Sequence, residues 1–285
     1  MPEIAYVNGR FCPIDEAVIS INDRGFQFAD SVYEVVAAYE GAPFRLQAHL
    51  DRLRRSLSLI DMEIDERRID FAGIIREGIA RAGFARTLAY LQVTRGVQAR
   101  SHLHSADLAP TVVATFRPKP EVDPAARAAG ISVVTVCDTR RVECEIKATA
   151  LLANVLALNR ARRKGYDDAI FVSPAGEIRE GTASNVFVVR HGMLMTPVCD
   201  ASILHGVTRQ FVLECARRIE HPVRETRLTV ADLQSADEAF FSSTTQDILA
   251  VTRVNRKPIG SGGVGPVTER LCETFLEGLG QPLEQ

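Results

Sequence analysis

The sequence predicts a two-domain protein of the α+β class. Segments with helical and with strand-like periodicity are both present, but they do not alternate strictly as β-α-β units do. Residues 117–123 (RPKPEVD) contain two prolines and alternating charge, which is typical of an extended connector. The 285 residues are enough for two modest domains, each with its own core. We therefore expect a smaller N-terminal α/β domain at 1–117, an interdomain linker at 118–123 and a larger mixed α+β domain at 124–285.

The first domain is expected to contain two helices with strands before and after them. Apolar side chains recur every three or four residues from Leu46 to Ile60 and again from Phe71 to Ile79, so each set shares one face of a helix. The second helix should end near Gly83. Runs of β-prone residues between turn residues predict strands at Ile4–Val7, Ala17–Ile21, Glu34–Tyr39, Ala89–Thr94 and Thr111–Phe116.

The second domain is expected to mix strands with two longer helices. A long helical stretch is predicted from about Ala148 to Lys164, and an amphipathic helix from about Val207 to Ile219. The predicted strands are Ile131–Val136, Asp168–Val172, Val186–Val189, Glu238–Ser242 and Ile248–Val254.

Composition excludes several classes of protein. Hydrophobic residues make up 46% and charged residues 25%, as in a folded globular chain. The net charge of −2 provides no general attraction to nucleic acid or to a membrane surface. No apolar run reaches the roughly 18 residues of a membrane span, and the first residues do not resemble an export signal. The six cysteines form no CxxC pair. We expect reduced thiols, no metal, no nucleic-acid or membrane partner, and a cytoplasmic protein.

The segment from Glu145 to Asn154 contains the first candidate for chemistry. Lys147 follows a strand-prone run and is expected to open an apolar helix. Desolvation disfavours an ammonium ion, so a lysine in such a place can serve as an amine nucleophile and proton carrier. A surface lysine at a helix start would have the same local pattern.

Three further segments carry polar groups beside turns. Residues 176–187 predict a hairpin in which Glu180 is followed by small residues, which would let a flat ligand approach its carboxylate. For this fragment alone, an ordinary solvated hairpin is the favoured interpretation. The Gly206-Val207-Thr208 step begins a helix, where free backbone N–H groups favour an anion. Ordinary capping would also explain the threonine. Residues 242–246 (SSTTQ) place hydroxyl groups directly after a strand.

Taken in order, these segments resemble the fold-type IV pyridoxal-phosphate enzymes: branched-chain aminotransferases, D-amino acid aminotransferases and aminodeoxychorismate lyases. The resemblance covers nearly the whole chain. It also includes Tyr6–Gly9, Asp23–Glu34 and His49–Leu53, and its most specific strings are Glu180–Phe187 and the lysine segment. It implies pyridoxal 5′-phosphate (PLP) as cofactor and a pseudo-barrel arrangement of the larger domain.

The resemblance also implies roles for individual residues. Lys147 would form the internal aldimine, a Schiff base, and later move the proton between the substrate Cα and C4′ of the cofactor. Glu180 would partner the pyridine nitrogen and favour its protonated form, which makes the ring a better electron sink. Leu204 would pack against the ring. The 5′-phosphate would be held by Arg52, Val207, Thr208 and Thr244, with Ser243 nearby.

Substrate choice depends on the segment around Arg100 and His102. These two residues are similar to the pair that D-amino acid aminotransferases use, together with a tyrosine, here Tyr33, to hold the substrate α-carboxylate. In the family this loop reaches the active site of a neighbouring subunit, so a homodimer is implied. Taken alone, the segment could equally be an exposed polar loop. His102 and His104 lack a third ligand for a metal ion.

These inferences together predict a PLP-dependent transaminase with ping-pong kinetics. It would move an amino group from a D-amino acid, such as D-alanine or D-glutamate, to 2-oxoglutarate or pyruvate. A branched-chain L-amino acid aminotransferase and an aminodeoxychorismate lyase are the main alternatives, followed by an (R)-selective amine transaminase. A non-catalytic binding protein would have no need for both Lys147 and Glu180. Ala29 and Ser31 flank Asp30 where the D-amino acid enzymes have glycines, which bears on the substrate range.

Overall fold

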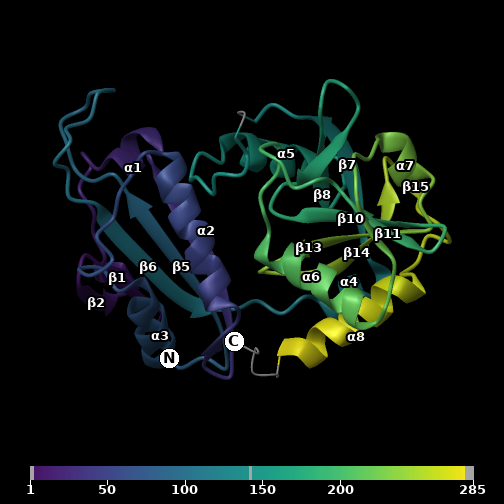
Figure 1. Ribbon diagram of the computed structural model, residues 1–285, viewed down its shortest axis with the longest axis horizontal. Coiled ribbons are helices and arrows are strands. Elements are labelled where there is room, and N and C mark those ends of the chain that lie inside the picture. The colour runs from purple at the N-terminus through teal and green to yellow at the C-terminus, as the bar shows by residue number, and fades with distance from the viewer. Residues whose placement is uncertain (1–2, 141–142, 280–285) are drawn as a thin grey trace. The chain divides into compact units, whose positions relative to one another are not determined.

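The computed structural model describes residues 3–140 and 143–279, and the chain divides into two compact units (Figure 1). Unit 1 comprises the described residues up to Pro120 together with Ile146–Ala150. Unit 2 comprises those of Glu121–Glu145 and those from Leu151 onward. Both units combine helices with a sheet, which confirms the α+β class. Residues 146–150 fall in the range predicted for the C-terminal domain but pack with unit 1, which therefore carries Lys147.

Unit 1 is built on a six-stranded antiparallel sheet in the order β2-β1-β6-β5-β3-β4. Its strands are β1 (Ile4–Val7), β2 (Arg10–Pro13), β3 (Ser31–Tyr39), β4 (Ala42–Pro43), β5 (Arg86–Thr94) and β6 (Thr111–Pro118). Its helices are α1 (Arg24–Phe28), α2 (Leu46–Leu59) and α3 (Phe71–Ala82), with a 3-10 turn at Ile14–Glu16. In Figure 1, α2 runs along the sheet, and it packs on β3 while α3 packs on β5 and β6.

The core of unit 1 follows from the predicted helical periodicity. Leu50, Leu53 and Leu57 of α2 are buried, as are Phe71 and Ile75 of α3. Burying such side chains removes apolar surface from water, which stabilises the unit by about 1.5–3 kcal/mol for each. The helix α3 stops at Gly83, whose left-handed backbone (φ 65°) matches the predicted end.

The strand predicted at Ala17–Ile21 is wrong. Residues 17–20 have no regular structure. Val18 and Ile21 are 80% and 77% exposed, so this apolar run does not contribute to the core. The β-prone composition is present, but no neighbouring strand among the described residues pairs with the segment and no face of it is covered.

Unit 2 contains a nine-stranded mixed sheet in the order β12-β11-β10-β13-β14-β7-β8-β9, with β15 paired to β14. Its strands are β7 (Ile131–Cys137), β8 (Asp168–Val172), β9 (Ile178–Gly181), β10 (Asn185–Arg190), β11 (Met193–Thr196), β12 (Val223–Glu225), β13 (Glu238–Ser243), β14 (Asp247–Val254) and β15 (Lys257–Pro258). Its helices are α4 (Pro124–Ala129), α5 (Leu152–Arg163), α6 (Val207–Arg218), α7 (Val230–Gln234) and α8 (Pro266–Leu279). The helices α6 and α8 pack on each other and on β13.

The helix predicted from Ala148 begins only at Leu152, so the prediction that Lys147 opens a helix is wrong. The apolar run predicted a buried helical face, but its side chains do not form one: Leu152 is 71% and Val155 is 52% exposed. The buried residues of α5 are the small Ala157 and Ala161. The residues before α5 form turns and bends with one bridge, from Ala148 to Val32, and residues 146–150 belong to unit 1.

Candidate active site

Lys147 is fixed through its backbone to β3 of unit 1. Its carbonyl accepts a hydrogen bond from the Tyr33 N–H (2.9 Å), and its own N–H donates to Ser56 Oγ (3.2 Å). The next residues continue this pairing, because the Thr149 N–H donates to the Ser31 carbonyl (3.2 Å). The short strand β4 pairs only with the end of β3, at Ala38 and Tyr39. The lysine segment pairs with the same edge of β3 near its start, where Ala148 bridges to Val32. The Lys147 Nζ lies 4.2 Å from the centre of the Tyr33 ring.

A buried ion pair lies beside this segment. Glu34 of β3 accepts two hydrogen bonds from Arg52, at 2.7 Å from Nε and 2.8 Å from Nη2, and one from His49 Nδ1 at 2.8 Å. Glu34 and His49 are almost completely buried and Arg52 is 8% exposed. Arg52, predicted to hold a phosphate, is therefore oriented by a carboxylate to which the sequence assigned no role.

The two groups that hold Arg52 have shifted pKa values. Burial raises the pKa of Glu34, but the charge and hydrogen bonds of Arg52 outweigh it and leave the pKa well below its ordinary value. Burial lowers the pKa of His49, and the neighbouring carboxylate opposes this only in part. A neutral His49 donating from Nδ1 to an ionised Glu34 fits both directions.

This pair could have been found from the sequence. His49 and Arg52 fall on the same helical face as Leu46, Leu50 and Leu53, and that face is buried. A charged residue at a core position requires a partner. Glu34, within the apolar run of β3, has the complementary charge.

Glu180 of unit 2 is held by hydrogen bonds to both of its oxygens. Its Oε2 accepts from the Leu204 N–H (3.0 Å) and from Asn185 Nδ2 (3.2 Å). Its Oε1 accepts from Arg140, which itself donates twice to Asp138 (3.0 and 2.8 Å). The structure thus brings together two predicted residues, Glu180 and Leu204, and adds Arg140 and Asn185.

Arg140 is almost fully enclosed. Its guanidinium lies 4.3 Å from the centre of the Phe171 ring, and its side chain is 7% exposed. Burial lowers the pKa of Arg140, but the bonds to Asp138 and the charge of Glu180 raise it above its ordinary value overall. The cluster of two carboxylates and one guanidinium has a net negative charge, which suits a cationic ring nitrogen as ligand.

The helix α6 begins at Val207, shortly after Leu204 in the sequence, and its N-terminus is a candidate anion-binding site. Gly206 precedes the helix without a capping side chain, and Val207 and Thr208 are buried. The first N–H groups of a helix have no partner within the helix. A Cβ on Gly206 would overlap Asn185 Oδ1, so a larger residue there would displace the Asn185 side chain. Asn185 also donates to the Leu204 carbonyl (2.9 Å), which ties this loop to Glu180.

Ser243 and Thr244 lie at the end of β13 and in the turn that follows, as predicted, and both are half-buried. Ser243 Oγ accepts from the Gln246 N–H (3.2 Å). Among the described residues, the buried hydroxyls of Ser184 and Ser242 have no hydrogen-bond partner. Unsatisfied buried hydroxyls of this kind, together with the α6 N-terminus, fit a phosphorylated ligand.

The three residues predicted to hold a substrate carboxylate are not gathered by this chain. Tyr33 stacks on Tyr90, with ring centres 5.4 Å apart and Lys147 close by. Arg100 and His102 lie instead against Phe28, at the side of α1. In the described part of the chain, neither has a hydrogen bond or ion pair with Tyr33.

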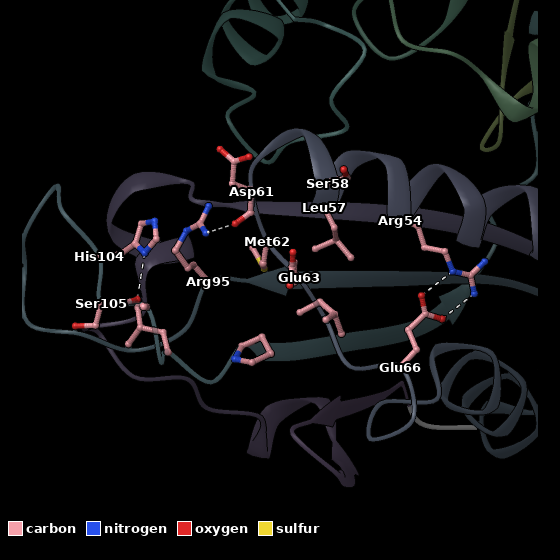
Figure 2. Close-up of a pocket in the computed structure, with 14 residues that line it drawn as sticks. Arg54, Leu57, Ser58, Asp61, Met62, Glu63, Glu66, Arg95, His104 and Ser105 are labelled. Atoms are coloured by element: carbon pink, nitrogen blue, oxygen red, sulfur yellow. Dashed lines mark hydrogen bonds and ion pairs between the residues drawn. The ribbon is translucent and has the colours of Figure 1, made fainter.

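A pocket of about 820 Å³ in unit 1 lies apart from all of these residues (Figure 2). Its wall comes from the end of α2 and from residues 61–66 and 104–110. Both arginines that Figure 2 labels already have partners: Arg54 binds Glu66, and Arg95 binds the Asp61 carbonyl. This pocket contains no predicted site residue.

Two further findings concern only the described residues. Within 3–140 and 143–279, no three His, Cys, Asp or Glu side chains are grouped to hold a metal ion. In the same ranges, no helix has the length and apolar character needed to cross a membrane.

Comparison with known proteins places these features in a wider context. Residues 31–254 match the family described as amino-transferase class IV. The D-alanine aminotransferase of Listeria monocytogenes serotype 4b (strain F2365) is 36% identical over 274 residues, covering 95% of this chain and 94% of the relative. That of Bacillus licheniformis is 35% identical over 272 residues, covering 95% and 94%.

Solved structures of branched-chain amino acid aminotransferases are also similar. The T.th. enzyme complexed with N-(5′-phosphopyridoxyl)-L-glutamate has a TM-score of 0.89 at 27% identity, covering 97% of this chain and 93% of that one. The Escherichia coli enzyme has a TM-score of 0.88 at 25% identity, with 97% and 94% covered.

Proposed function

Since this chain belongs to the class IV amino-transferase family, we propose that it transfers the amino group of a D-amino acid to a 2-oxo acid such as 2-oxoglutarate or pyruvate. The chain is an aminotransferase, and its cofactor is PLP. The predicted fold type, enzyme class and cofactor are thereby confirmed. The preference for D-amino acids is supported by the D-alanine aminotransferases, which align with about 95% of the chain.

When bound, PLP supplies an aldehyde carbon that takes up the amino group and a pyridine ring that accepts the electron pair left at Cα. We assign the proton transfer to Lys147, whose Nζ would take the proton from the substrate Cα and deliver it to C4′ of the cofactor. The backbone bonds of Lys147 to Tyr33 and Ser56 fix the base of this side chain, and its Nζ lies over the Tyr33 ring.

Glu180 would hold the proton on the pyridine nitrogen. The hydrogen bonds from Leu204 and Asn185 fix the direction of its carboxylate, and Arg140 and Asp138 add a charged support behind it. The phosphate would be bound by Arg52, by the N–H groups of Val207 and Thr208, and by Thr244 with Ser243 nearby. Leu204 would pack on the ring.

We propose that Arg100 and His102 act on the substrate bound by a second copy of the chain, together with Tyr33 of that copy. Neither residue contacts Tyr33 within the described part of one chain, which supports a contribution from a partner. Unit 1 also exposes large apolar side chains that a homodimer would cover. These side chains are Val18, Ile19, Ile21, Phe26 and Leu103. A cytoplasmic location is proposed from the spacing of the six cysteines, which form no CxxC pair.

The alternative, a branched-chain L-amino acid aminotransferase, is favoured by the solved structures with TM-scores of 0.88 and 0.89. The holoenzyme should be mixed with D-alanine or L-leucine, with no acceptor present, and the cofactor absorbance followed. We expect loss of the lysine-bound absorbance with D-alanine only. Loss with L-leucine only would refute the D-amino acid proposal. Pyruvate formed from aminodeoxychorismate without an acceptor would indicate a lyase.

The role of Lys147 has a separate test. Borohydride treatment of the holoenzyme should fix the cofactor to the lysine that binds it, and peptide mass analysis should locate the added mass on Lys147. An unmodified Lys147 in cofactor-loaded protein would contradict the assignment and favour a binding protein without catalysis.

A further inference from the structure

The ring of Phe28, at the end of α1, contacts both residues proposed to bind the substrate carboxylate. The Arg100 guanidinium lies 4.5 Å from the ring centre, and the His102 ring lies 5.6 Å away at an interplanar angle of 61°. Arg24, one turn earlier on α1, lies 5.0 Å from the same ring centre. One half-buried aromatic ring is therefore shared by three cationic or ionisable side chains.

Arg24 holds the backbone of the same loop. Its Nη1 donates to the Ser101 carbonyl (2.6 Å) and its Nη2 to the His102 carbonyl (3.2 Å). Its Nε donates to Asp30 (2.7 Å), which also accepts from Arg95. Arg24 is 5% exposed, and these bonds are partly buried. Arg24 thus ties α1 to residues more than 70 positions away.

Asp30 completes this cluster. Burial raises the pKa of Asp30, but Arg95 and Arg24 outweigh burial and lower it below its ordinary value. Asp30 is thus ionised at neutral pH, and its carboxylate fixes the guanidinium of Arg24 by accepting the hydrogen bond from Nε.

The loop needs such support because it has no regular secondary structure of its own. Residues 98–106 form bends and turns, and Arg100 and His102 are exposed. A free arginine side chain loses conformational entropy when it is fixed on a ligand. Stacking on an aromatic ring restricts the arginine side chain before the ligand binds. Less entropy is then lost on binding, so the affinity for the ligand is higher.

We propose that Phe28 and Arg24 are positioning residues that hold Arg100 and His102 in the arrangement that captures the substrate carboxylate. This inference rests on the proposed function of Arg100 and His102. Phe28 orients the two side chains, and Arg24 fixes the backbone carbonyls of Ser101 and His102. Neither residue touches PLP or the reacting atoms in this scheme. Their loss should therefore weaken substrate binding and leave the chemical step unchanged.

The test is a double-mutant cycle on the holoenzyme with D-alanine as donor and 2-oxoglutarate as acceptor. Phe28→Leu should raise the KM for D-alanine about three- to tenfold and leave kcat within about twofold, because a contact present in both ground and transition states affects KM alone. Arg100→Ala should raise KM further. Adding Phe28→Leu to Arg100→Ala should raise KM less than Phe28→Leu does alone, since the ring then has only His102 to orient.

Phe11→Leu is the matched control. Phe11 is also half-buried in unit 1, and its ring centre also lies 4.5 Å from an arginine guanidinium, that of Arg81. It is on β2, at the opposite edge of the sheet from β3 and β4. It should leave KM unchanged. Arg24→Lys, which keeps the charge but cannot reach both carbonyls, is a second variant and should raise KM as Phe28→Leu does. The affinity of each apoenzyme for PLP should remain at the wild-type value.

Three results would overturn the inference. If Phe28→Leu and Arg100→Ala raise KM additively, Phe28 does not act through Arg100. If Arg100→Ala raises KM but neither Phe28→Leu nor Arg24→Lys does, the positioning role is wrong while the carboxylate-binding role stands. If Arg100→Ala leaves KM unchanged, the carboxylate-binding role itself fails, and the positioning role fails with it.

Discussion

Replacing Glu34 by glutamine should destabilise unit 1 far more than replacing another glutamate that binds an arginine in the same way. Glu34 is fully buried and accepts three hydrogen bonds, two from Arg52 and one from His49. Glutamine has one acceptor oxygen, and its NH2 group would face a donor of the guanidinium or the imidazole. The positive charge of Arg52 would then lie in the protein interior without the carboxylate that balances it.

The magnitude follows from burial. Breaking a buried ion pair by neutralising one partner costs about 3–5 kcal/mol, whereas an exposed pair contributes about 0.2–1 kcal/mol. Glu66 offers the matched exposed case: it accepts from Arg54 Nε (2.6 Å) and Nη2 (2.7 Å) with its side chain 38% exposed. We expect Glu34→Gln to lower the free energy of unfolding by several kcal/mol and Glu66→Gln by less than about 1 kcal/mol.

The measurement is urea unfolding of the apoenzymes followed by far-UV circular dichroism, because the chain has no tryptophan to report fluorescence. The affinity for PLP gives a second readout, since Arg52 is proposed to bind the phosphate. It should fall for Glu34→Gln and stay unchanged for Glu66→Gln. Equal losses of stability in the two variants would refute the argument that burial gives the Glu34 pair its importance.

Three further predictions follow from the same geometry. Glu180→Gln should retain PLP but lower kcat about 10- to 100-fold. This factor corresponds to the roughly 1.5–3 kcal/mol that a hydrogen bond to a charged group contributes. An unchanged kcat would argue against a role of Glu180 at the ring nitrogen. Gly206→Ala should weaken PLP binding, since the new Cβ would overlap Asn185 and overpacking of this kind costs about 1–3 kcal/mol. The control is Gly263→Ala, where the nearest atom to the new Cβ is 3.8 Å away, and it should bind PLP normally in the same titration. Stability should fall as the pH drops below about 4.5, because the folded-state pKa values of Glu34 and Asp30 lie below their ordinary values of 4.5 and 3.8. The unfolded chain therefore takes up protons before the folded chain does. In an acid titration, the stability of Glu34→Gln should fall less steeply than that of the wild type.

Much of the local structure could be predicted from the sequence because it depends on short-range periodicity. The spacing of leucines predicted a helix at Leu46–Ile60, and α2 runs from Leu46 to Leu59. The predicted strands at Ile4–Val7 and Asp168–Val172 match β1 and β8. The run at Ala17–Ile21 has an equally β-prone composition but pairs with no strand in the described part of the chain, since pairing depends on a neighbour that local composition does not specify.

The chemistry was also evident in the sequence, since the strings around Lys147 and Glu180 specify the family and through it the cofactor. What holds each of these groups in place was decided by tertiary structure. The lysine segment pairs with β3 rather than opening a helix, and Arg140 supports Glu180 from 40 positions away. Arg24 binds carbonyl groups 77 and 78 positions further along the chain. Residue type and spacing determine which reactions a side chain can perform and which face of a helix or strand it occupies. Its partners are determined by which distant segments the folded chain brings together, because a buried charge must find its counter-charge in space and not along the sequence.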